Sequence, residues 1–350
     1  VDGIDQENWK ALNESIDKPL LNRALRGTYP PGSTYKPFMA LAALETGARS
    51  ASTVINDPGY WMYGNHRFRG HAAGPVNMHR SIVKSSNAYY YSLAYQMGVQ
   101  SIHDFMQPLG FGQRTGIDLN GEMRGVLPSP EWKRNAYKRA DMKRWFPGET
   151  VSLGIGQGYN NFTMLQLASA QATMVNGGTR YRPHMAKAVK NSVTGAITEI
   201  PQPPGENLGY LPRNVEIVRN AMVAVNKGGT GTRVFAGAPY TSGGKTGTAQ
   251  AVSLGQNVRY NAKALEEHQR DHSLFTAFAP AEAPTIALAL IVENAGFGAA
   301  HAAPIARRVF DYWLMGEYPS EADIAAVQKG QASAPIGKPR AAADVPLLVP

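Results

Sequence analysis

The 350-residue sequence contains no cysteine, so it has no disulfide, no thiolate metal site and no cysteine nucleophile. This absence does not decide the compartment. The sequence also lacks an apolar run near the roughly 18–20 residues that a membrane span needs, and no signal peptide opens it. Because the first residues, VDGIDQENWK, read like the middle of a longer chain, we expect an excised domain whose membrane anchor lies upstream.

Acidic residues are fewer than basic ones, and the formal net charge is +9. This balance favours an anionic surface or polymer as a partner. The densest basic run, residues 133–145, does not interleave stacking aromatics with its cations as a single-strand binder does. We therefore expect no nucleic acid, and favour a solvated basic face or contact with an anionic membrane or wall.

Hydrophobic periodicity predicts helices first and a small sheet later. Apolar stretches predict helices at 33–45, 85–97, 163–175 and 214–226, and an amphipathic helix at 303–315. Three runs predict strands at 241–252, 273–280 and 285–294, the last two forming a hairpin. This order favours an α+β fold with an antiparallel sheet over alternating βαβ units. Residues 201–209 predict a surface loop, and the Ala/Pro-rich residues 317–350 a peripheral tail.

The stretch YPPGSTYKPF, residues 29–38, holds Ser33 and Lys36 behind a rigid Pro-Pro-Gly. The S-x-x-K pattern alone is weak, because three further copies begin at Ser15, Ser81 and Ser242. Ser33 differs because it opens a strongly apolar helix, on which residues i and i+3 share a face. Lys36 would then reach the Ser33 hydroxyl and act as its base, if burial or a nearby cation lowers the pKa of the amine.

Two further motifs occur once each. Ser85-Ser86-Asn87 offers a second hydroxyl for proton relay and an amide that can orient a substrate. Lys245-Thr246-Gly247 lies in a predicted strand, where Gly247 would let a substrate backbone approach closely. The Lys245 cation would lower the pKa of Lys36 and attract a carboxylate.

The residue after the third motif, Thr248, raises a geometric question. The backbone N–H groups of Ser33 and Thr248 would form an oxyanion hole. Strict alternation, however, sends the side chains of Lys245 and Thr248 to opposite faces of a strand. Both can line one cleft only if this is an edge strand with strong twist.

Each motif also has a purely structural interpretation. A serine before an apolar helix is usually an N-cap, and SSN is often a cap or a turn. GGKTGT lacks the upstream glycine of a phosphate loop, and GIGQGY has Tyr159 in place of the third glycine of a dinucleotide loop. The ordered set, with separations of 52 and 160 residues, is much more specific, and a closely related set occurs in penicillin-binding proteins and class A β-lactamases.

The sequence resembles the class B penicillin-binding proteins, which are D,D-transpeptidases, over nearly its whole length. The resemblance rests on YPPGSTYKPF, SSNAYYYSLAYQMG, WFPGETVSLGIGQGY, GGKTGTAQ and RDHSLFTAFAP. It is nearest to the branch that serves cell elongation in rod-shaped Gram-negative bacteria. It implies a penicillin-binding transpeptidase fold, similar to the serine β-lactamases, with helices on both sides of the antiparallel sheet and an all-helical subdomain.

The same resemblance implies the domain organisation. Residues 1–318 would form the transpeptidase domain and residues 319–350 a peripheral tail, with a membrane anchor and a pedestal domain upstream. The catalytic domain would lie in the periplasm, held at the inner membrane. The implied partners are a membrane-embedded glycosyltransferase and the elongation scaffold proteins.

The resemblance implies a ping-pong acyl transfer between peptidoglycan stem peptides. A serine would attack the D-Ala–D-Ala bond, release D-Ala, and pass the acyl group to the amine of a second peptide. β-Lactams would acylate the same serine. Carried over position by position, the catalytic residues would be Ser33, Lys36, Ser85, Asn87 and Lys245, and the substrate-binding residues Thr246, Gly247 and Thr248. Relatives often have Asp where this chain has Asn87.

Some relatives bind zinc in the segment before the middle motif. The candidates here are Asp57, His66, His71 and His79. The segment has no cysteine and looks shortened, and histidines in a polar loop are usually solvated. We therefore expect no metal and no cofactor.

Three other functions stay open. A D,D-carboxypeptidase would use water as the acceptor. A β-lactamase would need a water-activating group, and EIVRN (216–220), which has the class A spacing, lies in a predicted helix 131 residues after Ser85. An inert β-lactam-binding scaffold would need no acceptor at all.

Overall fold

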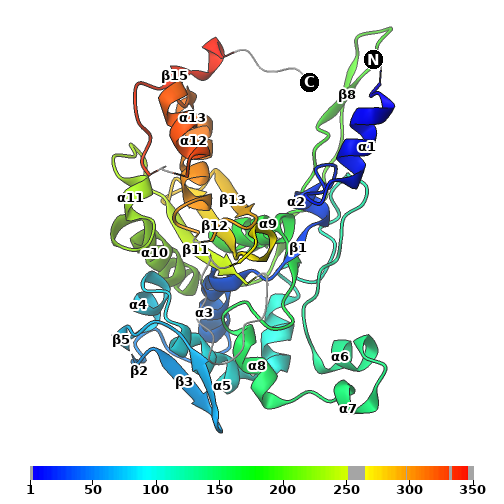
Figure 1. The fold of residues 1–350 in the computed structure, drawn as a ribbon. Coiled ribbons are helices and arrows are strands. Elements are labelled where there is room, and N and C mark those ends of the chain that lie inside the picture. Colours follow the sequence, from blue (N-terminus) through cyan, green and yellow to red (C-terminus); the bar gives the residue numbers. More distant parts are fainter. Residues whose placement is uncertain (1–2, 251–264, 297, 331–332, 346–350) are drawn as a thin grey trace.

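A three-stranded antiparallel sheet forms the centre of the computed structural model, which describes residues 3–250, 265–296, 298–330 and 333–345 (Figure 1). Its order is β11-β12-β13, with β11 at Gly243–Ala249, β12 at His272–Ala279 and β13 at Ile286–Val292. Gly243 pairs with Phe278, and Ser273 pairs with Val292. The predicted antiparallel strands are confirmed, although residues 251–252 of the first prediction lie outside the described residues.

Helices cover both faces of this sheet because β12 is apolar on both. Leu274 and Phe278 belong to the core that includes α9 (Met164–Val175) and α10 (Pro212–Gly228). The alternate residues Phe275 and Ala277 pack with α11 (Thr232–Phe235) and α12 (Ala302–Met315). Because successive side chains of β12 point to opposite faces, this strand contributes to two hydrophobic clusters, one on each side of the sheet. A sheet with helices packed on it is what the α+β prediction describes.

A helical region lies below the sheet in Figure 1. It contains α3 (Lys36–Glu45), α4 (Met78–Val83), α5 (Asn87–Met106) and α8 (Pro147–Leu153). The helix α3 is buried along most of its length because it is apolar nearly all round. The second predicted helix ends at Met97, where Gly98 adopts a φ of 75°, but the chain resumes a helical course to Met106.

The remaining elements are short. Helices α1 (Gln6–Glu14) and α2 (Arg23–Arg26) precede the first motif. Helices α6 (Pro130–Ala136) and α7 (Ala140–Lys143) lie in the segment between α5 and α8. Two-stranded ladders join β1 (Thr28–Tyr29) to β6 (Phe162–Thr163), β2 (Ile55–Asp57) to β5 (Gly74–Val76), β3 (Tyr60–Tyr63) to β4 (His66–Arg69), and β7 (Thr179–Arg180) to β10 (Glu206–Asn207).

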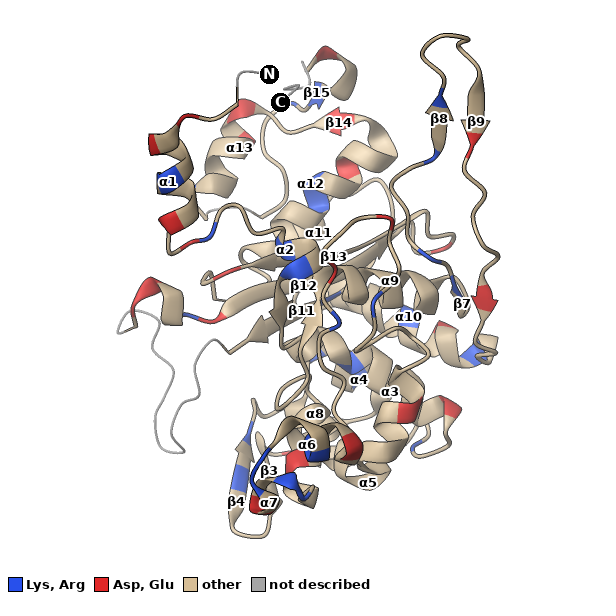
Figure 2. Cartoon of the chain, turned by 90° about the vertical axis from the view of Figure 1, so that its right-hand side faces the viewer, with Lys and Arg blue, Asp and Glu red and all other residues tan. Residues whose placement is uncertain are grey.

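One further ladder projects from the body. Strands β8 (Ala188–Lys190) and β9 (Ile197–Glu199) pair only with each other, and Figure 2 shows them as an arm that extends away from the remaining elements. All residues of both strands are exposed.

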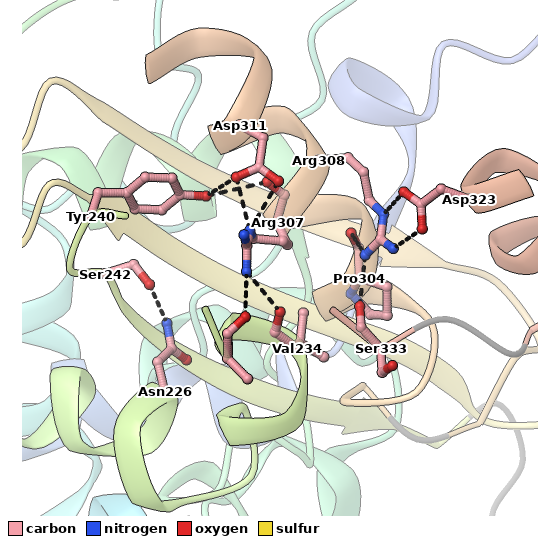
Figure 3. Close-up of polar contacts among 11 residues, drawn as sticks. Asn226, Val234, Tyr240, Ser242, Pro304, Arg307, Arg308, Asp311, Asp323 and Ser333 are labelled. Atoms are coloured by element: carbon pink, nitrogen blue, oxygen red, sulfur yellow. Dashed lines mark hydrogen bonds and ion pairs between the residues drawn. The ribbon is translucent and has the colours of Figure 1, made fainter. Parts of the chain in front are cut away.

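Part of the predicted C-terminal tail is ordered and packed. Helix α13 spans Glu321–Gln328, and β14 (Glu317–Tyr318) pairs with β15 (Arg340–Ala341). Asp323 is buried and holds Arg308 of α12 through contacts of 2.6 and 3.0 Å (Figure 3). No local pattern predicted this helix, because it is too short for clear periodicity and an ion pair with another helix anchors it. The division at residue 318 stays a prediction.

Within the described residues, none of the helices is both long enough and apolar enough to cross a membrane.

Candidate active site

Ser33 lies where the helical region meets the sheet. The segment Gly32–Tyr35 forms a 3₁₀ turn that continues directly into α3, and Ser33 is half-buried. Gly32 has a φ of 54°, and a Cβ atom there would lie 2.5 Å from the Thr248 carbonyl oxygen. Only glycine permits this close approach, which sets Ser33 beside the edge of β11.

Lys36 is fully buried and faces the second motif. Its Nζ donates to the Asn87 Oδ1 at 2.7 Å, to the Ser85 carbonyl oxygen at 2.7 Å and to Ser85 Oγ at 3.2 Å. Among the described residues, none hydrogen-bonds the Ser33 hydroxyl. The helical spacing thus brings Lys36 to the right region, but its amine is turned toward Ser85 and Asn87 rather than toward Ser33.

Ser85 is the point at which the second and third motifs meet. The Lys245 Nζ donates to Ser85 Oγ at 2.9 Å, across 160 residues of sequence. Ser85 has a φ of 55°, which is uncommon for a non-glycine residue and costs of order 1–3 kcal/mol. Such strain persists only where the surroundings over-determine it, and here both lysines hold the residue.

Both lysines have pKa values below the ordinary lysine value. Burial is the largest cause for Lys36, whose pKa is lowered well below that value, and the charge of Lys245 adds to the effect. Asp57 acts weakly in the opposite direction. Burial also lowers the pKa of Lys245 to about 7. The sequence analysis named burial and a nearby cation as possible causes, and the desolvation of the fully buried Lys36 amine lowers its pKa more than the Lys245 charge does.

The third motif lies on β11, an edge strand of the described sheet. Lys245 is fully buried, whereas Thr246 and Thr248 are half-exposed, as alternation requires. A Cβ at Gly247 would lie 2.8 Å from the Thr34 side chain, so the face that carries Lys245 packs on the 3₁₀ turn. Lys245 therefore reaches Ser85 beneath the strand.

Thr248 reaches the same region through its backbone instead of its side chain. Its carbonyl oxygen accepts a 3.4 Å hydrogen bond from the Gln157 side chain and lies against Gly32. In an antiparallel strand the N–H and C=O of one residue point to the same side. The Thr248 peptide groups thus face the free edge of β11, which removes the conflict between alternation and a shared cleft.

Three groups support the site; the sequence analysis gave a cap only as the structural interpretation of the SSN motif, and it missed the other two. Ser86 caps α5 by accepting from the Tyr89 N–H at 3.2 Å, and its hydroxyl donates to the buried Asp57 carboxylate. The Arg69 carbonyl oxygen accepts a 3.2 Å bond from the Asn87 amide. Gln157, part of a stretch that fails the dinucleotide pattern, contacts β11. The preference of serine for N-cap positions predicts the cap at Ser86. No local sequence pattern predicts the contacts of the Arg69 carbonyl and of Gln157.

The family comparison agrees with this geometry. A family model described as the penicillin binding protein transpeptidase domain matches residues 4–311. The chain belongs to the penicillin-binding protein transpeptidase family. It is 43% identical to the peptidoglycan D,D-transpeptidase MrdA of Acinetobacter baumannii over 323 residues, which are 90% of this chain and 47% of that protein. It is 37% identical to MrdA of Escherichia coli K12, covering 91% of this chain and 50% of that protein.

Structures of family members show the same fold. Penicillin-binding protein 2 of Pseudomonas aeruginosa, in complex with WCK 5153, superposes with a TM-score of 0.77 at 38% identity, covering 89% of this chain and 67% of that one. Penicillin-binding protein 2 of Helicobacter pylori, in complex with MreC, gives a TM-score of 0.75 at 28% identity, covering 90% and 55%. The predicted penicillin-binding transpeptidase fold is therefore confirmed. The chain spans about half the length of the curated relatives it matches.

The other S-x-x-K serines of this family member have structural surroundings. Ser81 is buried on α4 and donates to the Met78 carbonyl at 2.7 Å. Ser242 accepts a 2.9 Å bond from Asn226 (Figure 3). Ser15 accepts from the Asp17 N–H in an exposed turn. Ser33 alone of these four serines lies beside the cluster of Lys36, Ser85 and Lys245.

The zinc candidates do not form a cluster among the described residues, where no group of three or more His, Cys, Asp or Glu side chains is placed to hold a metal ion. Asp57 accepts from Ser86 and from the Gly59 N–H. The His66 ring packs on Phe68 with centroids 4.4 Å apart, and His71 and His79 are exposed.

Proposed function

We propose that this chain is the catalytic domain of a peptidoglycan D,D-transpeptidase with Ser33 as its nucleophile. The observation that carries the proposal is the Ser85 hydroxyl, which hydrogen-bonds two buried lysines next to the Ser33 turn. The name printed for the relatives, peptidoglycan D,D-transpeptidase, supports the same assignment.

In the acylation step, Ser33 Oγ attacks the carbonyl carbon of the penultimate D-Ala of a donor stem peptide. The hydroxyl proton passes to neutral Lys36, which the lowered pKa of that amine favours. For this transfer the Lys36 amine would turn from Asn87 toward Ser33. The C–N bond then breaks, and the departing D-Ala amine takes a proton from Lys36 through the Ser85 hydroxyl.

The oxyanion formed in this step needs donors. We assign them to the backbone N–H groups of Ser33 and Thr248, which belong to neighbouring segments at the Gly32 contact. Thr246 would hold the donor carboxylate, which Lys245 would attract through its charge from beneath the strand, and Asn87 would orient the donor peptide. Gly247 lets the strand pack closely on the Thr34 side chain, and so holds β11 against the turn that carries Ser33.

In the second step, the amine of another stem peptide attacks the acyl-enzyme carbonyl. Lys36 and Ser85 remove a proton from that amine, and Ser33 leaves as the hydroxyl, so the enzyme returns to its starting state. The product is an amide cross-link between two stem peptides. β-Lactams would acylate Ser33 as donor mimics.

The setting of the reaction is also part of the proposal. A neighbouring structure is described as penicillin-binding protein 2 with MreC, and another as a peptidoglycan synthase complex that coordinates polymerization and crosslinking. We infer an elongation role for this protein, with a scaffold protein and a membrane-embedded glycosyltransferase as partners. The catalytic domain would lie in the periplasm at the inner membrane.

Labelling with a fluorescent penicillin tests the nucleophile. We expect stoichiometric labelling of the wild-type protein, none of Ser33→Ala, and full labelling of the matched control Ser15→Ala, which alters an S-x-x-K serine in an exposed turn. Labelling of Ser33→Ala at the wild-type level would refute the assignment of Ser33.

The acceptor is tested separately, with stem-peptide substrates and mass analysis of the products. Cross-linked dimers support a transpeptidase, and D-Ala release without dimers would indicate a carboxypeptidase. Loss of the penicillin acyl group within seconds would indicate a β-lactamase.

A further inference from the structure

A cavity of about 220 Å³ lies at the root of the β8–β9 arm. Its walls come from the loop that follows α5, from α9, and from both limbs of the arm, which leave at β7 and return at β10. None of its lining residues belongs to the cluster around Ser33, so this cavity is distinct from the candidate active site.

The lining is cationic. It contains Arg114, Arg180 and Arg182 against a single carboxylate, Glu206. Arg180 is fixed, because its Nη2 lies 2.6 Å from Glu206 Oε2 and its Nη1 donates to the Pro108 carbonyl at 2.7 Å. These two contacts neutralise Arg180 and set the position of its guanidinium between the loop and the arm.

The other two arginines are uncompensated. No hydrogen bond or ion pair within the described chain involves Arg114 or Arg182, and both are exposed at the cavity rim. Two other carboxylates lie nearby. Asp118 accepts from the Met185 and Ala186 N–H groups at 2.7 and 2.8 Å, and Glu122 accepts from the Thr115 and Gly116 N–H groups at 2.6 and 3.1 Å. Arg114 and Arg182 therefore line one cavity without an ion-pair partner among the described residues, while both nearby carboxylates are bound by backbone N–H groups.

We propose that this cavity binds a ligand through a phosphate group, with Arg114 and Arg182 as its charged partners. A guanidinium offers a planar fork of N–H donors that matches phosphate oxygens in bidentate pairs. Within the lining itself, three guanidinium groups against one carboxylate leave two positive charges, which matches a phosphate dianion, whereas a single carboxylate would leave one charge unpaired. The bound group would bridge the loop after α5 to the outgoing limb of the arm, and so fix the arm relative to the body.

Calorimetry on the full chain at low ionic strength tests the proposal, with inorganic phosphate as the probe. We expect saturable one-to-one binding, weakened at least about tenfold in the Arg114→Gln/Arg182→Gln double variant, because each charge-assisted pair is worth about a factor of ten. The matched control is Arg134→Gln/Arg213→Gln, which removes the same charge from two exposed arginines outside the lining. It should bind as the wild type does.

Further arms identify the source of the phosphate group. Tighter binding of glycerol phosphate than of inorganic phosphate indicates a soluble ester, and co-sedimentation with phosphatidic acid vesicles that the double variant loses indicates a lipid headgroup. Hydrogen exchange in residues 181–206 should slow when phosphate is present. Absence of phosphate binding, or equal binding by the double variant and the wild type with unchanged melting temperature, would overturn the proposal.

Discussion

Lys245 donates a 2.9 Å hydrogen bond to the hydroxyl of Ser85. The same hydroxyl lies 3.2 Å from the Lys36 amine, so one oxygen connects two buried amines. Because two ammonium groups at this separation repel each other, the pair is most stable with one lysine charged and the other neutral. The pair is therefore suited to hold a neutral base and a positive charge side by side.

This pair predicts a bell-shaped pH dependence for acylation. Activity should rise as the pH passes the lowered pKa of Lys36, since only the neutral amine accepts the serine proton. It should fall above about pH 7, where Lys245 loses the charge that attracts the carboxylate. Acylation rates with a fluorescent penicillin between about pH 5 and 9 provide the measurement. A rate independent of pH over this range would contradict the assignment.

Replacing Lys245 with methionine should abolish acylation and stabilise the fold. The folded pKa of Lys245 lies below the unfolded value of 10.5, so the unfolded state binds the proton more tightly and the buried amine destabilises the fold at neutral pH. We expect Lys245→Met to raise the free energy of unfolding by up to about 4 kcal/mol at pH 7, the value that corresponds to a pKa lowered from 10.5 to about 7.

The sign of this effect sets its pH dependence. The gain should be full below pH 7 and should shrink as the pH rises toward 10.5. Urea unfolding at several pH values measures it, with Lys84→Met, at an exposed lysine, as the matched control. A loss of stability for Lys245→Met at pH 6 would count against the buried-lysine account.

Gly32→Ala should separate Ser33 from β11. A Cβ at this position would lie 2.5 Å from the rigid Thr248 backbone, and the φ of 54° is unfavourable for alanine. We expect acylation to fall about a hundredfold, as displacements near 1 Å do in active sites. Gly47→Ala is the matched control, because Gly47 has a φ of 70° and no atom within 4 Å of its Cβ position. Equal acylation by both variants would show that the close contact is dispensable.

Asp323→Ala should destabilise the fold without changing the chemistry. It leaves the buried Arg308 guanidinium without its carboxylate, which should lower the free energy of unfolding by about 3 kcal/mol. The control Glu321→Ala removes a more exposed ion pair with Arg340 and should cost less than about 1 kcal/mol. Chemical denaturation compares the two, and penicillin acylation of the folded variants should match the wild type.

Much of the fold could be predicted from the sequence. The burial of α3 and the two-sided strand β12 follow from apolar runs that only a core accepts. The S-x-N and K-T-G motifs, each present once, identified Ser85 and Lys245. Relationships without a local pattern were missed, as with Asp323, whose role depends on an arginine 15 residues earlier in another helix.

The site shows the same division. Asp57 was considered as a zinc candidate. In the structure its carboxylate accepts hydrogen bonds from the Ser86 hydroxyl and from the Gly59 N–H. The β8–β9 arm was not predicted, because its strands are exposed on both faces and carry no burial pattern. Only the tertiary contacts distinguish these cases.

The sequence by itself determined the choice of Ser33, because the spacing of three motifs is encoded in residue types and order. It also determined which segments become core, because apolar surface must leave water. Only the tertiary structure decided that Lys36 faces Ser85, that Thr248 takes part through its backbone, and that burial lowers the pKa of Lys36 more than the Lys245 charge does. Desolvation and close backbone approach both depend on which distant residues surround a group in the folded protein, and local sequence patterns do not specify those neighbours.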